Sequence, residues 1–431
     1  MFGLFSSQNK KMRDTARNWI SMAEKVWAYR RDVIDEPERR ELQSRTEALR
    51  AKVRAKADAA DLKLAIDALE PVLSRLGGKI YPKTSMIDNV EFFLVAAIVI
   101  LGLRTYVVQP FKIPTNSMWP SYYGMTVDNL LVKHENPTGI ERLARLLAFG
   151  AMRYEVSAPQ SGDVSAKFYG NGLMAYTLVR GHKWLILPTT LKEYTFYVNG
   201  AETKVDVPED FNEFDDVVEQ TLFGSKAGFQ KTFEDAARNH QLEASYVPVG
   251  VGSDEARRAY LLHTGRTVAQ GAPVLRFDLL TGDQLFVDRM SYNFVEPHVG
   301  SGFVFRTDHI PQIGRQDYFI KRLVGVPGDK LQIKAPVLWR NGAPITGAEA
   351  FDKEAKRIDS YPGYSDATTY GWDYLRRGQV MTVPQNKFFA MGDNSANSLD
   401  GRYWGFVPAK DVVGRPLFIY YPLTKRWGFA H

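Results

Sequence analysis

The sequence contains no cysteine among its 431 residues. This absence excludes disulfide bonds, a cysteine nucleophile and metal sites built on thiolates. Histidine is scarce as well, with seven residues scattered along the chain. His134-Glu135 lacks the second histidine of a zinc-protease helix, so we expect no metal site. A G-x-S-x-G nucleophile elbow is also missing, and with it the usual signature of an α/β-hydrolase.

The chain is basic, with 55 Lys and Arg against 49 Asp and Glu and a formal net charge of +6. Residues 1–89 hold 18 basic and 13 acidic side chains, so five of the six net charges lie in that segment. A basic segment ahead of an apolar run is typical of a cytoplasmic flank attracted to anionic lipid. No helix-turn-helix, zinc or RNA-binding signature accompanies the charge, so we expect no nucleic-acid partner.

Residues 1–80 have a helical pattern. The stretch "RRELQSRTEALRAKVRAKADAADLKLAIDALEPVLSRLGG" is rich in Ala, Leu, Arg, Glu and Lys and ends at Gly77-Gly78. "RNWISMAEKVWAYRRDVI" precedes it, with Asp35-Glu36-Pro37 at the turn between them. We predict a helical hairpin or a pair of helices at a membrane surface, with no catalytic role.

An apolar stretch follows this segment. It is uninterrupted from Phe92 to Leu103 and reaches seventeen residues at Val108, with Arg104 as the only charge. Twelve residues fit a buried core helix, whereas seventeen residues, followed by Pro110 as a helix stop, favour a membrane span. More Lys and Arg precede the span than follow it closely, so we expect the N-terminus in the cytoplasm.

The remainder of the chain is typical of β structure. "GDQLFVDRMSYNF" and "DYFIKRLVGVPGDKLQIK" are short, rich in Val, Ile, Phe and Tyr, and punctuated by Gly-Asp and Pro-Gly turns. "VLWRNGAPIT" and "YTFYVNGAETKVDV" carry Asn-Gly between strand-like runs, which predicts two hairpins. "DDVVEQTLF" and "GFQKTFEDAARNHQ" have helical patterns instead.

One lysine has the setting of a general base. A serine nucleophile needs a group that takes its proton, and a lysine can do this only when burial keeps it neutral. In a strand over "YFIKRLVG", Phe319, Lys321 and Leu323 share one face, and Ile320 and Arg322 share the other. Lys321 is therefore expected among apolar neighbours, and Arg322 is expected to point away from it.

Three segments together resemble a known family. "FKIPTNSMWPS", "DYFIKRLVGVPGD" and "MGDNSANSLDGRYWGFVP" resemble the diagnostic motifs of type I signal peptidases, in the family's order and directly after the predicted span. "TGDQLFVDRMSYNF" and "DVVGRPLFIYYP" resemble its Gly-Asp strand region and its closing strands. The resemblance implies a mainly antiparallel β catalytic domain on the outer face of the membrane that the helix spans. It also implies a Ser-Lys dyad, and neither cofactor nor metal.

The resemblance also implies roles for the residues of the catalytic centre. Ser117 matches the nucleophile and Lys321 the general base. Thr115 matches a serine whose hydroxyl helps to hold the oxyanion, together with the backbone N–H of Ser117. A hydroxyl is what that position needs, so threonine is compatible with it.

Further positions match supporting and substrate-binding residues. Ser398 matches a serine that hydrogen-bonds to the lysine and orients it. Asp400 and Arg402 match a supporting pair, and Ile113 and Ile320 match positions that line shallow pockets for small side chains.

The chain departs from the family pattern at several places. Asn116 and Gly401 stand where the family usually has Gly and Ser, and Ser395 stands where it usually has Arg. Val127 to Ala269 is an insertion long enough for a domain.

The expected organisation has seven segments in chain order. They are a cytoplasmic helical segment (1–86), a transmembrane helix (87–109), catalytic core with the nucleophile (110–126), an α+β insertion (127–269), core with the lysine (270–335), a small β subdomain (336–377) and core with the C-terminal motif (378–431).

Together with the predicted span, the resemblance implies a membrane-bound serine endopeptidase that cleaves signal peptides from exported preproteins after small residues. Its partners would be those preproteins and the lipid bilayer. We expect a single-pass protein of the bacterial inner membrane, with the catalytic domain on the outer side. Two alternatives remain: an inactive relative that binds exported chains through the insertion, and a Ser-Lys self-cleaving repressor. The repressor would need a DNA-binding module and no membrane span, and the sequence has the reverse features.

Overall fold

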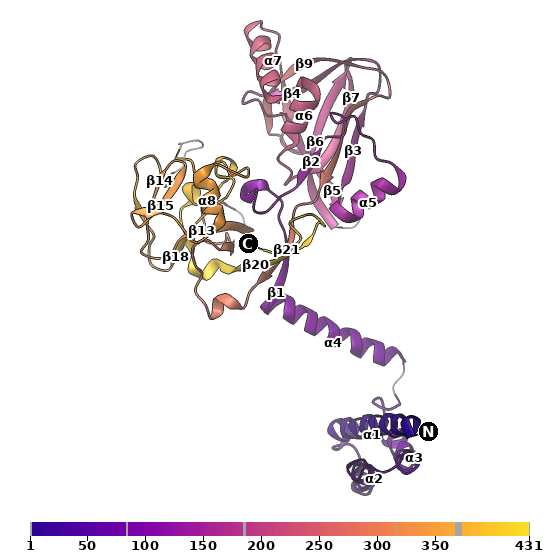
Figure 1. Cartoon of the computed structure of the whole chain (residues 1–431). Helices are drawn as coiled ribbons and strands as arrows, with labels where there is room; N and C mark the ends of the chain where they lie inside the picture. Colours follow the sequence, from indigo (N-terminus) through magenta and orange to yellow (C-terminus); the bar gives the residue numbers. More distant parts are fainter. Residues whose placement is uncertain (1, 83–84, 184–186, 315, 367–372, 431) are drawn as a thin grey trace. The chain divides into compact units, whose positions relative to one another are not determined.

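The computed structural model describes residues 2–82, 85–183, 187–314, 316–366 and 373–430 (Figure 1). The chain divides into two compact units, Met1–Gly102 and Leu103–His431. The first unit is helical, and the second holds the β structure.

Three helices build the core of the first unit: α1 (Phe2–Arg30), α2 (Glu36–Arg54) and α3 (Ala59–Leu76). They pack around buried apolar side chains that include Leu42, Leu49, Leu62 and Leu73. The predicted helical character is confirmed, but the predicted pairing of two helices is wrong. The longer stretch divides because Lys56 adopts a left-handed conformation and Asp58 caps α3 by accepting a hydrogen bond from Asp61 N, 2.8 Å away.

The apolar stretch forms α4 (Ser85–Tyr106). Its segment Asp88–Tyr106 has a mean hydropathy of 1.6 over 19 residues, and none of it is buried. By length and composition it is a candidate membrane span. The helix ends at Tyr106, before Pro110, because Val108–Lys112 forms strand β1 and pairs with β11 (Gln284–Asp288).

The sheet that carries the site is antiparallel. Its strand order is β1-β11-β20-β12-β13-β18-β19, with β21 paired to β20. The remaining strands are β12 (Gly302–Arg306), β13 (Tyr318–Gly325), β18 (Lys387–Met391), β19 (Val407–Pro408), β20 (Val412–Tyr421) and β21 (Gly428–Phe429).

A small antiparallel sheet follows β13 in the chain. Its order is β16 (Ala343–Pro344), β15 (Val337–Arg340), β14 (Lys330–Lys334) and β17 (Met381–Thr382), with α8 (Glu349–Lys356) beside it. These strands extend past 336–377 on both sides, because β14 and β17 pair across that interval. The shorter elements of this part of the chain are η2 (Ser291–Asn293), η4 (Ser395–Asn397), α9 (Gly401–Trp404) and η5 (Ala409–Asp411).

The insertion contains two further antiparallel sheets. One has the order β5-β6-β4-β9-β8, with β7 paired to β6, and α6 (Phe214–Phe223) and α7 (Lys226–Arg238) pack on it (Figure 1). Its strands are β4 (Gly162–Tyr169), β5 (Tyr176–Lys183), β6 (Leu187–Val198), β7 (Ala201–Pro208), β8 (Glu243–Pro248) and β9 (Ala256–Val268). Both helices match stretches that were predicted helical.

The second sheet of the insertion has the order β2 (Thr126–Asp128), β10 (Pro273–Leu280), β3 (Met152–Ser157). Leu275, Phe277 and Leu279 of β10 belong to the same buried apolar cluster as the larger sheet. The β structure of the insertion therefore continues to Leu280, eleven residues beyond the predicted end at Ala269.

Both predicted Asn-Gly hairpins are confirmed. Asn199-Gly200 joins β6 to β7, and Asn341-Gly342 joins β15 to β16. All four residues have positive φ, as a type I′ turn requires at both central positions.

Candidate active site

Ser117 lies in a short, internally braced loop after β1. It belongs to the 3-10 turn η1 (Asn116–Met118), in which Met118 is fully buried and Ser117 is partly accessible. Asn116 closes the loop, since its Oδ1 accepts from Gly124 N at 2.8 Å and its Nδ2 donates to Met125 O at 3.0 Å. The nucleophile candidate is thus held by side-chain hydrogen bonds on the residue just before it.

Lys321 reaches Ser117 from strand β13. Its Nζ lies 2.6 Å from Ser117 Oγ, although the two residues are 204 positions apart. The lysine is only 4% exposed, and burial lowers the pKa of its ammonium group to about 8, against the opposing effects of Asp400 and Asp393. A substantial neutral fraction at mildly alkaline pH makes this amine a competent proton acceptor.

The two faces of β13 have different surroundings. Phe319 shares the Lys321 face, and its ring centroid lies 5.4 Å from Nζ. Arg322 points the other way as predicted, and it is itself buried. It pairs with Asp393, with its Nη2 at 2.6 Å from Oδ2, and donates from Nη1 to Gly300 O at 2.6 Å.

Ser121 joins this ion pair to the nucleophile loop. Its hydroxyl donates to Asp393 Oδ2 and accepts from Arg322 Nη2 at 3.0 Å. Ser121 and Tyr361 also share a hydrogen bond of 2.9 Å between their hydroxyls. Sequence reasoning missed this network, because a charged residue next to Lys321 on a strand is typical of a solvent-exposed face.

Asp400 and Arg402 form a second buried pair. Arg402 donates to both carboxylate oxygens of Asp400, at 2.9 and 2.7 Å, and Asp400 Oδ2 accepts from Gly392 N at 3.0 Å. A side chain at position 392 would collide with Ser398 Oγ and with the carbonyl oxygen of Ser117. The pair therefore anchors a glycine that the nucleophile loop approaches closely.

Ser398 lies beside Ser117 but does not make the expected contact. It is 3% exposed, and its Oγ hydrogen-bonds to none of the residues that the structure describes. The structure thus brings this hydroxyl into the site without the predicted hydrogen bond to Lys321.

Two of the departures from the family pattern have a steric or hydrogen-bonding reason. A Cβ at Gly401 would lie 2.8 Å from Ala390 O and 2.9 Å from the Phe389 ring, so a serine there needs its neighbours to move. Ser395 is fully buried and accepts from Arg402 Nη1 at 2.8 Å. It therefore serves as a partner for Arg402 in the support beneath the loop.

The three remaining predicted residues lie around the dyad. Thr115 directly precedes η1, in extended conformation. Ile113 is buried in an apolar cluster with Met118, and Ile320 packs against the same cluster. The structure therefore gathers all eight predicted positions into one region.

One further residue arrives from the insertion. Glu213, at the start of α6, accepts a hydrogen bond from Asn116 Nδ2 at 2.7 Å. Burial raises the pKa of its carboxyl group, and the Asn116 hydrogen bond opposes that rise. No local signal in the sequence marks this contact, since the two residues are 97 positions apart.

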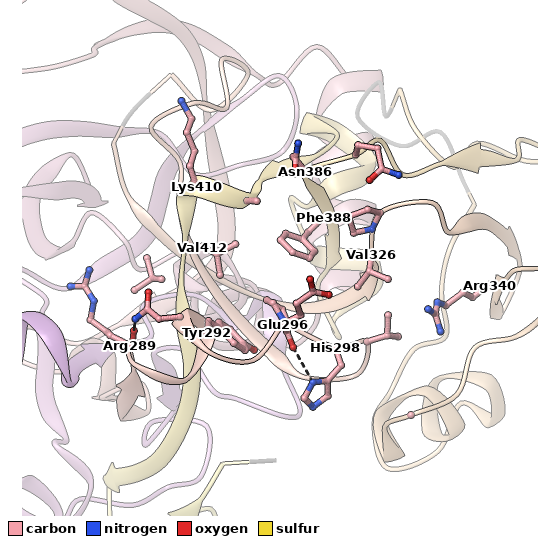
Figure 2. Close-up of a pocket in the computed structure, with 18 of the residues that line it drawn as sticks. Arg289, Tyr292, Glu296, His298, Val326, Arg340, Asn386, Phe388, Lys410 and Val412 are labelled. Carbon is pink, nitrogen blue, oxygen red and sulfur yellow. Dashed lines mark hydrogen bonds between the residues drawn. The ribbon is translucent and has the colours of Figure 1, made fainter.

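A cavity of about 1190 Å³ lies elsewhere in this unit (Figure 2). Its lining includes Arg289, Tyr292, His298, Phe388 and Lys410, and neither Ser117 nor Lys321 is part of it. Size alone would favour this cavity as a binding site. We place the candidate active site at the dyad instead, because a hydroxyl in contact with a buried amine is the arrangement that nucleophilic catalysis requires.

Comparison with known proteins identifies the family of this chain. The family model described as "Signal peptidase, peptidase S26" matches residues 275–421. "Signal peptidase I S" of Bacillus subtilis is 30% identical over 140 residues, which cover 32% of this chain and 70% of the relative. The chain belongs to the signal peptidase I family.

Other members of the signal peptidase I family match similar fractions of the chain. "Probable signal peptidase I-1" of Synechocystis is 31% identical over 150 residues, covering 34% of this chain and 66% of the relative. A crystal structure of a signal peptidase I from Enterococcus faecalis covers 28% of this chain and 97% of that chain, at 25% identity and a TM-score of 0.21.

The matches with known proteins include only part of the relatives and only part of this chain. The chain spans less than two thirds of two Synechocystis relatives, 66% of "Probable signal peptidase I-1" and 59% of "Probable signal peptidase I-2". The family model begins at residue 275, so it includes Lys321 and the 391–402 segment but not the loop of Ser117. The role of that loop rests on its motif and its geometry.

Proposed function

We propose that this protein is a membrane-bound serine endopeptidase that cleaves N-terminal signal peptides from exported preproteins after small residues. The observation that carries the proposal is the 2.6 Å contact between Ser117 Oγ and the buried Lys321 amine, whose pKa is lowered to about 8. Membership of the signal peptidase I family supports the substrate class.

The first chemical step is acyl transfer to Ser117. Neutral Lys321 Nζ takes the hydroxyl proton as Oγ forms a bond to the scissile carbonyl carbon. The negative charge that develops on the carbonyl oxygen is stabilised by the Ser117 N–H and the Thr115 hydroxyl. Breaking the C–N bond releases the mature chain, whose amine takes the proton from the Lys321 ammonium group.

The second step removes the signal peptide from Ser117. Lys321, neutral again, takes a proton from a water molecule that attacks the ester carbonyl, and then returns that proton to Ser117 Oγ. The proposed role of Ser398, a buried hydroxyl without a hydrogen-bond partner among the described residues, is to orient the lone pair of Lys321. Ile113 and Ile320 line the apolar surface on which small substrate side chains lie.

Replacement of Ser117 tests the proposal directly. Ser117→Ala should remain folded but lose preprotein cleavage by several orders of magnitude, because the covalent nucleophile is gone. Ser253→Ala, at an exposed serine of the insertion, should cleave normally. Preprotein cleavage by a folded Ser117→Ala protein at the normal rate would rule out Ser117 as the nucleophile. Absence of cleavage by the unmodified protein would favour the inactive, chain-binding role.

The proposed location is the bacterial inner membrane, with α4 as a single span and the catalytic unit outside. The apolar character of α4 and the excess of Lys and Arg before it support this orientation. Protease added to spheroplasts should digest the exposed loops of the second unit and spare residues 8–82. Digestion of the N-terminal unit alone would show that the protein has the opposite orientation in the membrane.

A further inference from the structure

Helix α5 (Gly139–Phe149), in the insertion, turns its apolar side outward. Its four large aliphatic side chains are all exposed: Ile140 by 87%, Leu143 by 51%, Leu146 by 45% and Leu147 by 67%. None of the eleven residues of the helix is buried. A surface helix of a soluble domain ordinarily packs its apolar stripe against the core, so this orientation is reversed.

The polar side of α5 holds the helix in that orientation. Arg145 Nη2 lies 2.5 Å from Asp128 Oδ2, and Arg145 Nε lies 2.9 Å from Asp278 Oδ2. Asp278 also pairs with Arg153, at 2.5 Å. At 100° per residue, Arg145 lies some 140° around the helix from Ile140. A largely buried ion-pair network thus fixes the helix with its aliphatic arc facing away from the protein.

The exposed apolar surface continues onto the C-terminal segment. Leu423 N donates to Ala148 O of α5 at 2.9 Å, and the Tyr421 hydroxyl donates to Leu146 O at 3.1 Å. This segment exposes three more large apolar side chains: Leu423, Trp427 and Phe429. Exposed apolar side chains thus occur on two elements that are hydrogen-bonded to each other within the second unit.

The charges around this surface are mostly basic. Arg142 of α5 and Lys425 of the C-terminal segment are exposed, while Glu141 is the acidic residue on α5 itself. A short amphipathic helix with aliphatic residues outward, a basic rim and a neighbouring tryptophan is typical of a segment that lies in the headgroup region of an anionic bilayer.

We propose that α5 and the C-terminal segment 421–430 form a membrane-binding surface, separate from α4, that lies in the interface of an anionic lipid bilayer. The helix would enter the headgroup region with Ile140, Leu143 and Leu147, while its ion pairs hold the insertion above it. This contact does not depend on the Ser-Lys chemistry.

The absence of native cysteine allows a direct test. The full chain carrying Leu147→Cys would be labelled with an environment-sensitive fluorophore and placed in nanodiscs of phosphatidylethanolamine and phosphatidylglycerol. Gln230→Cys, at an exposed position of α7 in the same insertion, is the matched control. Nitroxide groups on the lipid chains should quench the label at 147 roughly threefold or more above the label at 230.

Two outcomes would overturn the proposal. Equal quenching at positions 147 and 230 would mean that α5 stays in water. A label at 147 that is shielded from water but is not quenched by lipid nitroxides would mean that protein, such as a second copy of the chain, covers the helix. Because the readout is fluorescence, it is independent of whether the protein cleaves preproteins.

Discussion

At the scale of single residues, the proposed chemistry depends on the protonation state of Lys321. An ordinary lysine has a pKa of about 10.4 and is almost fully charged at neutral pH. Burial beside Phe319 and Ser117 lowers the pKa of Lys321 to about 8, although two carboxylates act in the opposite direction. The desolvation of this one amine is therefore what separates an active from an inactive dyad.

The pH dependence of cleavage follows from the direction of that shift. Below pH 8 the amine is mostly protonated and cannot accept the Ser117 proton, so the rate should rise as the pH increases through about 8. Lys321→Arg should be inactive, because a guanidinium group keeps its proton at any usable pH. Initial rates on a short peptide between about pH 5 and 11 measure both effects.

Lys330→Arg, at an exposed position on β14, is the matched control and should leave the profile unchanged. Substantial activity in Lys321→Arg, or a rate that does not change between pH 6 and 9, would rule out this lysine as the base.

At the scale of elements, α6 of the insertion is joined to the nucleophile loop. Glu213 precedes α6 and accepts from Asn116, whose backbone carbonyl also accepts from Asn394 Nδ2 at 3.1 Å. Asn116 thus lies between the insertion and the 391–402 segment. We infer that α6 helps to position the loop that carries Ser117.

Removal of this contact should slow the reaction modestly. Glu213→Ala removes one hydrogen bond from Asn116, and a net contribution of about 0.5–1.5 kcal/mol corresponds to a roughly two- to tenfold lower kcat. Glu213→Gln retains an acceptor oxygen and should restore most of the rate. Steady-state kinetics on a short peptide, with KM determined separately, distinguish this positioning effect from weaker substrate binding.

Asp210→Ala, at a nearby exposed position, serves as the control and should behave like the unmodified protein. A normal kcat in Glu213→Ala, or no recovery in Glu213→Gln, would show that α6 does not position the loop through this hydrogen bond.

At the scale of the whole molecule, the insertion leaves and re-enters the catalytic core at one place. Tyr123 N donates to Asp283 Oδ2 at 2.8 Å, and Asp283 N donates to Tyr123 O at 2.8 Å. The two chain ends therefore already lie side by side. The apolar cores on the two sides are separate clusters, one in the insertion and one that includes Ile113 and Met118.

A short bridge between the two ends should preserve the catalytic core. With residues 125–281 replaced by two glycines, we expect a folded protein that still cleaves a short peptide, at a reduced rate because Asn116 loses Glu213 and Met125. A protein that lacks residues 127–269 should instead aggregate, because Leu275 and Phe277 of β10 lose the apolar residues of the insertion that bury them. Gel filtration and peptide cleavage compare the two proteins.

The opposite result, a soluble protein after deletion of 127–269 and an unfolded one after replacement of 125–281, would show that β10 belongs to the catalytic core. That outcome would show that the insertion ends at Ala269, as the sequence predicts.

Features that depend on neighbouring residues could be predicted from the sequence. Lys321 and Arg322 lie on opposite faces of β13 because side chains alternate along any strand. Asn199-Gly200 and Asn341-Gly342 form turns because these residues readily adopt positive φ. The three motifs are also short local stretches, but it was their resemblance to a known family that predicted one site for Ser117, Lys321 and Asp400, since Ser117 and Lys321 are 204 positions apart.

Features that depend on distant contacts were decided by the tertiary structure alone. Arg322 is buried because Asp393, 71 positions away, neutralises it. Glu213 reaches Asn116, and α5 faces outward, because partners remote in sequence hold each of them. Periodicity tells which side of a helix is apolar, but only the ion pairs of Arg145 with Asp128 and Asp278 determine that this side points away from the protein.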